Sequence, residues 1–283
     1  MQRYKILHRT YYNFSGTVTL GPHTLRLRPR EDHEVRIKSS LLKITPTATL
    51  RWHRDVEDNS VAVASFHTPA NQLAIESEVV IQQYNLAPLD FLIADYAVNY
   101  PFAYTPEEWK VLSPYAACSV QSSNTLLGDW LANLWYSHEK LQTYSLLQRI
   151  TAHIHQTVSY RRREEAGVQS ASETLTFGTG SCRDLANLFI ESVRYLGFAS
   201  RFVSGYLHAE PSSINYGSTH AWAEVFLPGA GWKGFDPSIG EIVGADHIVV
   251  AVARSPELVP PVEGSFVGPT GASLDVGVWV TKL

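Results

Sequence analysis

Cysteine and methionine are scarce in this chain of 283 residues, which contains two cysteines and one methionine. Cys118 and Cys182 are far apart in the sequence, so they do not form the disulfide framework of a small secreted protein. The paired Cys and His ligands of a structural zinc site are also missing. We therefore expect at least one free thiol, whose reactivity depends on whether its surroundings stabilise a thiolate.

The chain also lacks long apolar runs and a large excess of one charge. No segment approaches the roughly 18 apolar residues of a membrane helix, and residues 1–10 contain no apolar stretch of signal-peptide length. A net charge of -4 and a pI of about 6.3 give no electrostatic basis for binding nucleic acid. We expect a cytoplasmic protein without a membrane or nucleic-acid partner. The sequence leaves its oligomeric state open.

The composition, 45% hydrophobic and 18% charged, is sufficient for one large or two modest domains. Residues 1–85 contain short alternating segments separated by turn residues, which predict an antiparallel, β-sandwich-like N-terminal domain. Residues 86–123 are rich in proline and aromatic residues and predict an ordered connector. Residues 124–283 contain helical patterns followed by strand patterns, so we assign them to a second domain and the whole chain to the α+β class.

Cys182 follows the turn Gly178-Thr-Gly-Ser and begins a predicted helix over residues 182–196. The free backbone N–H groups and the positive end of the helix dipole favour a thiolate at this position. The thiolate is the nucleophilic form of cysteine. By itself, this pattern is more typical of a buried structural cysteine. Cys118 has no adjacent motif, and we interpret it as a small buried apolar residue.

Two strand-like segments follow, at residues 218–227 and 231–236. Alternation places His220 on the face opposite the core, where it would be accessible for proton transfer. Asp236 ends the second segment, and a carboxylate there can accept the imidazole N–H. If the two strands are antiparallel neighbours, His220 and Asp236 come together. With Cys182 they then give the nucleophile, base and orienting group of thiol acyl-transfer enzymes.

Four ordered motifs resemble the transglutaminase-like core of bacterial proteins. They are Gly180-Ser-Cys-Arg-Asp, Ala199-Ser-Arg-Phe-Val-Ser-Gly-Tyr, His220-Ala-Trp-Ala-Glu-Val and Gly231-Trp-Lys-Gly-Phe-Asp-Pro. Residues 20–29, Leu-Gly-Pro-His-Thr-Leu-Arg-Leu-Arg-Pro, are similar to the β domain that precedes this core in one bacterial subfamily. The resemblance implies a papain-like core, in which a helix bearing the cysteine packs on an antiparallel sheet bearing histidine and aspartate. Cys182, His220 and Asp236 match the positions of its triad.

Calcium-dependent relatives use clustered acidic ligands, and the sequence contains no such loop. We therefore expect neither a metal nor a cofactor. Thr179 and Ser181 depart from the family pattern, in which a bulkier residue often precedes the cysteine, and this difference could widen the pocket.

The resemblance leaves three functions open. Our first choice is a cysteine peptidase or amidase acting on peptide or protein amides, with the Cys182 backbone N–H and the Tyr160 hydroxyl as candidate oxyanion donors. The second is a transglutaminase, in which an amine intercepts the thioester. The third is a non-catalytic scaffold, which an intact triad argues against. We favour hydrolysis because polar residues 210–217, before His220, contain no long aromatic stretch to exclude water.

Overall fold

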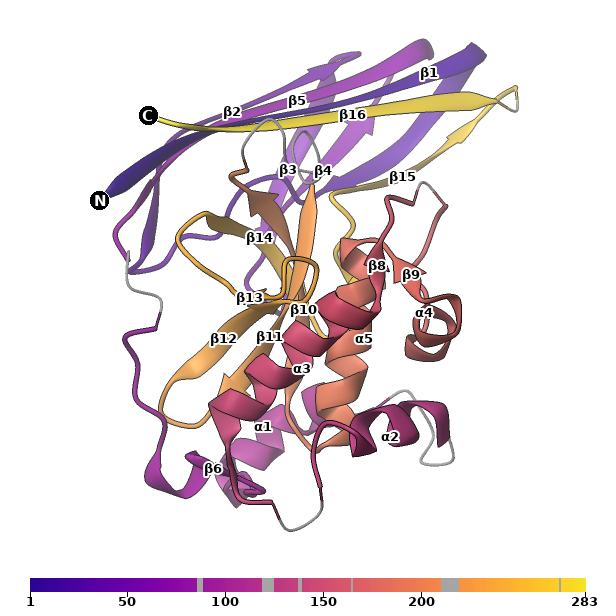
Figure 1. Ribbon diagram of the computed structural model, residues 1–283. Helices are drawn as coiled ribbons and strands as arrows, with labels where there is room; N and C mark the ends of the chain where they lie inside the picture. Colours follow the sequence, from indigo (N-terminus) through magenta and orange to yellow (C-terminus); the bar gives the residue numbers. More distant parts are fainter. Residues whose placement is uncertain (86–88, 119–124, 137–138, 164, 210–218, 270) are drawn as a thin grey trace.

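The computed structural model describes residues 1–85, 89–118, 125–136, 139–163, 165–209, 219–269 and 271–283, which form two larger antiparallel sheets, two short strand pairs and a group of helices (Figure 1). The strands are β1 (Gln2–Leu25), β2 (Val35–Thr45), β3 (Ala48–Arg54), β4 (Ser60–Phe66), β5 (Ala70–Gln83), β6 (Asn99–Tyr100), β7 (Leu141–Gln142), β8 (Ser159–Tyr160), β9 (Thr179–Gly180), β10 (Ser200–Leu207), β11 (His220–Leu227), β12 (Gly231–Asp236), β13 (Glu241–Ile242), β14 (His247–Ala253), β15 (Val262–Val267) and β16 (Ala272–Lys282). The α-helices are α1 (Pro106–Ala116), α2 (Thr125–Ala132), α3 (Thr143–Thr157), α4 (Ala171–Phe177) and α5 (Cys182–Tyr195). The short 3₁₀ turns are η1 (Asp95–Ala97) and η2 (Pro256–Leu258).

The first sheet is organised around β1, whose 24 residues are long enough to pair with two groups of strands. Its N-terminal half pairs with β5 and β16, and its C-terminal half pairs with β4 and β15, in each case antiparallel. A shift in register between Asn13 and Val18 separates the halves. Side chains from β1, β4 and β5, including Leu20, Leu25 and Leu73, form one buried cluster. The antiparallel fold predicted for the N-terminal region is confirmed.

The last two strands belong to this first sheet. β16 pairs with β1 from Tyr4–Lys282 to Phe14–Ala272, and Figure 1 shows it running beside β1 with both chain ends at the same side of the sheet. The sequence analysis assigns all of residues 124–283 to the second domain, whereas β15 and β16 pair with β1 of the first sheet. The physical reason is that β5 covers only one edge of β1, and β16 pairs the backbone groups of the other edge.

The second sheet has the order β13-β12-β11-β10-β14 and forms the predicted α+β core with the helices. Helices α3 and α5 cover one face, where α5 contributes Leu185, Leu188 and Phe189 to the largest buried cluster. These apolar positions recur at helical spacing, which is why the segment forms a helix that packs on a sheet. On the other side, Tyr206 and Ile248 of β10 and β14 pack against β1, β5 and β16. The core is therefore joined to the first sheet by buried contacts.

The connector contains a helix that the sequence analysis does not predict. α1 begins with a capping box, in which Thr105 Oγ1 accepts from the Glu108 N–H and the Glu108 carboxylate accepts from the Thr105 N–H. Upstream, the ring of Tyr100 stacks on that of Phe198 at a centroid distance of 5.2 Å. The aromatic residues of this segment thus pack onto the core.

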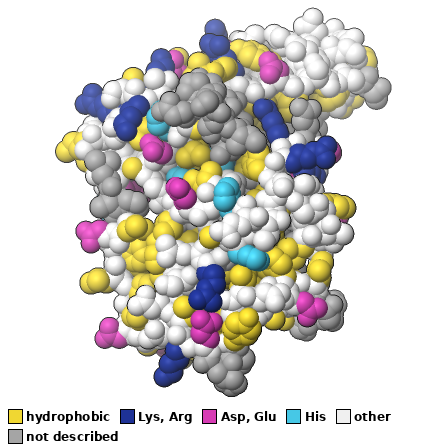
Figure 2. Space-filling model, viewed as in Figure 1, with side chains coloured by type: hydrophobic (Ala, Val, Ile, Leu, Met, Phe, Trp, Pro, Cys, Tyr) yellow, Lys and Arg dark blue, Asp and Glu magenta, His cyan; other side chains and the backbone are white. Residues whose placement is uncertain are grey.

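Basic and acidic side chains are interspersed on the face shown in Figure 2. None of the helices in the described part of the chain is long and apolar enough to cross a membrane.

Candidate active site

Cys182 is held at the start of α5 by a short, tightly packed approach. α4 ends at Gly178, whose φ of +63° is a left-handed conformation that glycine adopts without a steric penalty. The chain then forms β9, which pairs in parallel with β8, so that Gly180 lies beside Tyr160. A Cβ atom on Gly180 would lie 2.9 Å from that of Asp184, so this position has no room for a side chain.

Asp184 fixes the first turn of α5. One carboxylate oxygen accepts from the backbone N–H and the hydroxyl of Ser181, at 2.8 and 2.7 Å. The other accepts from Arg163 Nη1 at 2.7 Å and the Gln169 N–H at 2.8 Å. Burial opposes its charge, but these contacts outweigh burial and lower the pKa of Asp184. A fully buried carboxylate thus ties the helix bearing Cys182 to the preceding loop.

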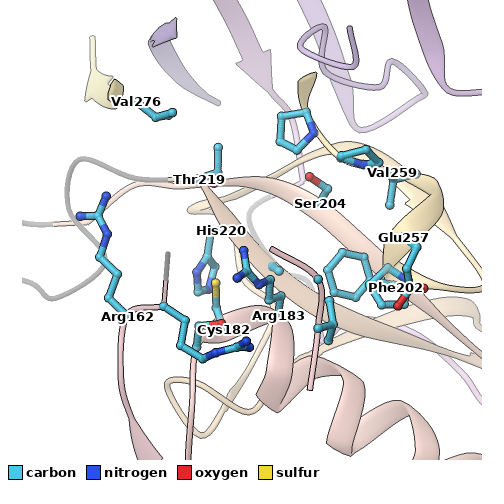
Figure 3. Close-up of a pocket in the computed structure, with 18 of the residues that line it drawn as sticks. Arg162, Cys182, Arg183, Phe202, Ser204, Thr219, His220, Glu257, Val259 and Val276 are labelled. Atoms are coloured by element: carbon cyan, nitrogen blue, oxygen red, sulfur yellow. The ribbon is translucent and has the colours of Figure 1, made fainter. Parts of the chain in front are cut away.

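His220 and Asp236 form the centre of a hydrogen-bond network at the start of β11 and the end of β12. The two strands are antiparallel neighbours, and His220 Nε2 lies 2.6 Å from Asp236 Oδ2. Asp236 Oδ1 accepts from the N–H of Ser238 at 2.9 Å and from its hydroxyl at 2.6 Å. Because Nε2 of His220 is engaged by the carboxylate, the ring's other nitrogen remains for Cys182, whose sulfur lies beside the ring in Figure 3.

A second histidine, His247, completes this network. Its Nε2 lies 3.1 Å from Asp236 Oδ2, and its Nδ1 accepts the N–H of Gly244 at 3.2 Å. Since Nδ1 is an acceptor, the proton of the neutral ring is on Nε2 and points at Asp236. The sequence analysis missed His247. It carries no local motif, and only the pairing of β14 beside β10 brings it to the site.

The predicted accessibility of His220 is wrong, because the side chain is 3% exposed. The face opposite the α5 helix holds a second apolar cluster formed by Val203, Trp222 and Val252. The ring of His220 lies 6.0 Å from that of Trp222 and 6.1 Å from that of His247. Both faces of the sheet are therefore covered at this point, and His220 lines the adjoining cavity.

The electrostatics of the pair follow from this burial. Burial disfavours the imidazolium, but the charge and hydrogen bond of Asp236, with the adjacent Cys182, outweigh it and raise the pKa of His220 to about 10. Burial also disfavours the carboxylate, but the two histidines lower the pKa of Asp236. The network thus favours an imidazolium–carboxylate pair at neutral pH.

Tyr160, the sequence-predicted oxyanion donor, lies beside Cys182. Burial, followed by the charge of Cys182, raises the pKa of the Tyr160 hydroxyl, with a hydrogen bond to Cys182 acting in the same direction. The hydroxyl therefore stays protonated at neutral pH and can donate a hydrogen bond. β8 is responsible for this placement, since its pairing with β9 brings Tyr160 next to the start of α5.

Cys182, His220 and Tyr160 open onto one cavity of about 520 Å³ (Figure 3). Its other lining residues come from the loop after β8, the start of α5, β10, the start of β11 and the segment between β14 and β15, and Val276 of β16 also reaches it. Residues 210–217, on which the predicted lack of an aromatic wall rests, lie outside the described residues. Cys118 is remote from this cavity. Cys118 is half-buried, and its sulfur lies 3.4 Å from the carboxylate of Glu191. Its surroundings are therefore more polar than predicted.

His220, Asp236 and His247 also form a group whose nitrogen and oxygen atoms lie within 4.8 Å of one another, close enough to hold a metal ion. Two histidines and a carboxylate are a ligand set that zinc accepts. In this network the same Asp236 oxygen already faces both Nε2 atoms. A metal there would replace the hydrogen bond that orients His220, so the group is better suited to proton handling than to metal binding.

Comparisons with known proteins agree with this architecture. Residues 4–82 match the bacterial transglutaminase-like N-terminal region, and residues 136–237 match the transglutaminase-like superfamily. An uncharacterized protein of Mycobacterium leprae (strain TN) is 24% identical over all of both chains. An uncharacterized protein of Mycobacterium tuberculosis (strain H37Rv) is 26% identical over 98% of this chain and 91% of its own length.

A solved structure from Cytophaga hutchinsonii, provisionally named a cysteine protease, is similar with a TM-score of 0.75 and 17% identity. The alignment covers 100% of this chain and 91% of that chain, which establishes a shared fold across both parts of the molecule. The two family matches cover most of β1 to β5 in the first sheet and the part of the core that holds Tyr160, Cys182, His220 and Asp236. The chain therefore joins a bacterial transglutaminase-like N-terminal region to a core of the transglutaminase-like superfamily.

Proposed function

We propose that the protein is a cysteine peptidase or amidase in which Cys182 is the nucleophile. The observation that carries the proposal is the arrangement in one cavity of the Cys182 sulfur, the buried His220 with its 2.6 Å contact to Asp236, and the Tyr160 hydroxyl. A protonated imidazole beside the sulfur favours a thiolate, which is the nucleophilic form. A purely structural cysteine has no need of this set of groups.

In the first half of the reaction, the Cys182 thiolate attacks the carbonyl carbon of an amide and the carbonyl oxygen becomes an oxyanion. The Cys182 backbone N–H, free at the first turn of α5, and the Tyr160 hydroxyl donate hydrogen bonds to that oxygen. His220 gives its proton to the nitrogen as the C–N bond breaks, so the amine leaves and a thioester remains. In the second half, His220 takes a proton from water, hydroxide attacks the thioester, and the acid and the Cys182 thiolate are released.

Asp236 and His247 act through His220 in this scheme and are positioning residues. Asp236 holds the ring and stabilises the imidazolium, and the proton on His247 Nε2 holds Asp236. Removing any one of these three side chains leaves a buried charged group without its hydrogen-bond partner. We therefore expect the three side chains to contribute cooperatively.

Hydrolysis is favoured over transfer to an amine by the charged lining of the cavity. Arginines and Glu257 line it, and Tyr160 and Phe202 are its aromatic lining residues in the described part of the chain. Charged side chains retain water, and water is present at about 55 M, so a thioester here is exposed to a large excess of the hydrolytic nucleophile. We therefore rank a peptidase or amidase first and a transglutaminase second.

The proposal is tested by measuring amine release from a library of peptide amides and, in parallel, incorporation of a fluorescent amine into a glutamine-bearing protein. We expect hydrolysis to exceed incorporation, and Cys182→Ala and His220→Gln each to lower kcat/KM by about 10³-fold or more. Cys118→Ala is the matched control and should retain activity. Robust Cys182-dependent incorporation with little hydrolysis would make the protein a transglutaminase. Activity that survives in Cys182→Ala would remove the nucleophile from the proposal.

A further inference from the structure

The cavity beside Cys182 carries an excess of positive charge. Arg162, Arg163 and Arg183 line it, and Glu257 is the acidic residue among its described lining residues. Arg163 is neutralised, because its Nη1 lies 2.7 Å from Asp184. Two arginines and one glutamate therefore remain to interact with whatever enters.

Arg183 is the residue after Cys182 and has unused hydrogen-bonding capacity. One of its terminal nitrogens, Nη2, donates to the backbone carbonyl of Glu165. Its Nε is buried and has no hydrogen-bond partner in the described part of the chain. Arg183 also lines the cavity, and a carboxylate is the acceptor whose geometry matches the guanidinium fork.

Arg162 lies across the sulfur from Arg183 in Figure 3 and comes from the loop after β8. No acidic side chain pairs with it among the residues that the structure describes. Its charge is close enough to Tyr160 to act on the pKa of that hydroxyl, in the direction that lowers it. Arg162 and Arg183 therefore place two positive charges on the wall of the cavity that holds Cys182.

The opposite wall has another character. It consists mainly of Phe202, Val259 and the prolines between η2 and β15. Glu257 lies beyond Phe202 in Figure 3, on the side away from Arg162. The acidic side chain is thus separated from the arginines by an apolar surface.

We propose that this cavity selects amides that carry a carboxylate within about one residue of the scissile bond. Arg162 and Arg183 hold the carboxylate, and the apolar wall receives the rest of the acyl or amine portion. This inference rests on the proposed function for its use in catalysis, but the carboxylate site itself can be measured without any hydrolysis.

The test compares iodoacetate with iodoacetamide as reagents for Cys182. In both reactions the sulfur displaces iodide from the CH₂ carbon, and the reagents differ in carrying a carboxylate or its neutral amide. Mass spectrometry of the Cys182 peptide gives both rate constants, and their ratio cancels changes in thiolate reactivity. The same ratio, the iodoacetate rate constant divided by the iodoacetamide rate constant, is measured for the thiol of glutathione. We expect the ratio for Cys182 to exceed that for glutathione by roughly two- to tenfold at low salt, and by less at high salt.

Arg162→Gln and Arg183→Gln should each lower this ratio by about two- to fivefold. Arg161→Gln is the control of equal charge, since Arg161 is exposed, adjacent in sequence and does not line the cavity. It should leave the ratio unchanged. A ratio no higher than that of glutathione, or an equal fall in Arg161→Gln, would overturn the carboxylate site.

A second measurement separates this inference from the proposed function. Matched peptide amides with aspartate or asparagine beside the scissile bond are assayed with the same variants. Hydrolysis of both peptides without an acidic preference would sink the carboxylate site and leave the peptidase intact. The expected reagent ratios with no hydrolysis of any amide would support the site and contradict the proposed function.

Discussion

At the scale of single residues, the site depends on one carboxylate oxygen shared by two histidines. Asp236 Oδ2 lies 2.6 Å from His220 Nε2 and 3.1 Å from His247 Nε2. In the second contact, the Gly244 N–H donates to Nδ1 of the His247 ring, which leaves the ring proton on Nε2, facing Asp236. In this way His247 orients the aspartate, and the aspartate orients the histidine that faces the sulfur.

The pKa values of this pair predict how its contribution to stability varies with pH. The folded pKa of His220, about 10, lies above its ordinary 6.5, so the stabilisation is complete below pH 6.5 and is lost as the pH rises toward 10. The folded pKa of Asp236 lies below its ordinary 3.8, so its stabilisation is present above pH 3.8 and is lost on acidification. The stability gap between the protein and Asp236→Asn should therefore be widest between pH 3.8 and 6.5. Urea unfolding over a pH series measures this gap, and a gap that does not change with pH contradicts the assigned directions.

At the scale of elements, the start of α5 is stabilised more strongly than the start of a neighbouring helix with the same sequence signature. α4 begins with the capping box Ser170–Glu173, which is exposed, and α5 begins with Ser181–Asp184, which is buried. Asp184 also forms the ion pair with Arg163. The helix that carries Cys182 is thus anchored from inside the molecule.

Asp184→Asn should lower the free energy of unfolding by about 3–5 kcal/mol, since it removes the buried charged partner of Arg163 and leaves that arginine only the exposed carboxylate of Glu165 at 3.6 Å. The variant should also react more slowly at Cys182 with iodoacetamide, because the first turn of α5 loosens. Glu173→Gln, at the equivalent position of the exposed box, is the control and should change neither quantity greatly. Equal destabilisation by the two substitutions would mean that burial and the ion pair add nothing to the cap.

At the scale of the whole molecule, one buried apolar cluster joins the two sheets, and we expect the sheets to unfold together because of it. That cluster combines Tyr4 and Ile6 of β1 with Tyr206 of β10, Ile248 of β14 and Val278 of β16. The β16 strand also supplies Val276 to the cavity beside Cys182. The first sheet therefore contributes a side chain to the cavity, although most of its strands come from the N-terminal part of the chain.

Val278→Ala removes two methyl groups from a side chain that is 2% exposed and should lower stability by about 2 kcal/mol. We expect a single unfolding transition with a lower midpoint, followed by both tryptophan fluorescence and circular dichroism. Leu274→Ala, in the same strand but 57% exposed, is the matched control and should shift the midpoint little. Two resolved transitions in Val278→Ala would show that the sheets unfold independently.

The sequence by itself determined the local elements and the chemistry that they carry. Cys182 at a helix start, His220 at the start of one strand and Asp236 at the end of the next follow from turn residues and from periodicities of 3.6 and 2, which depend on neighbours along the chain. The position of Tyr160, at the end of the helix before the nucleophile loop, made it a candidate donor, and the structure brings it to the sulfur through the pairing of β8 with β9.

Only the tertiary structure decided the surroundings of these residues. The burial of His220, the approach of His247 to Asp236 and the pairing of β16 with β1 join segments that are distant in the chain. Such contacts depend on which sheet faces and strand edges remain uncovered after the elements form. The local periodicity of the sequence does not specify which distant segment covers them. The arginine-lined cavity arises in the same way, because its walls come from six separate parts of the chain that meet only in the folded molecule.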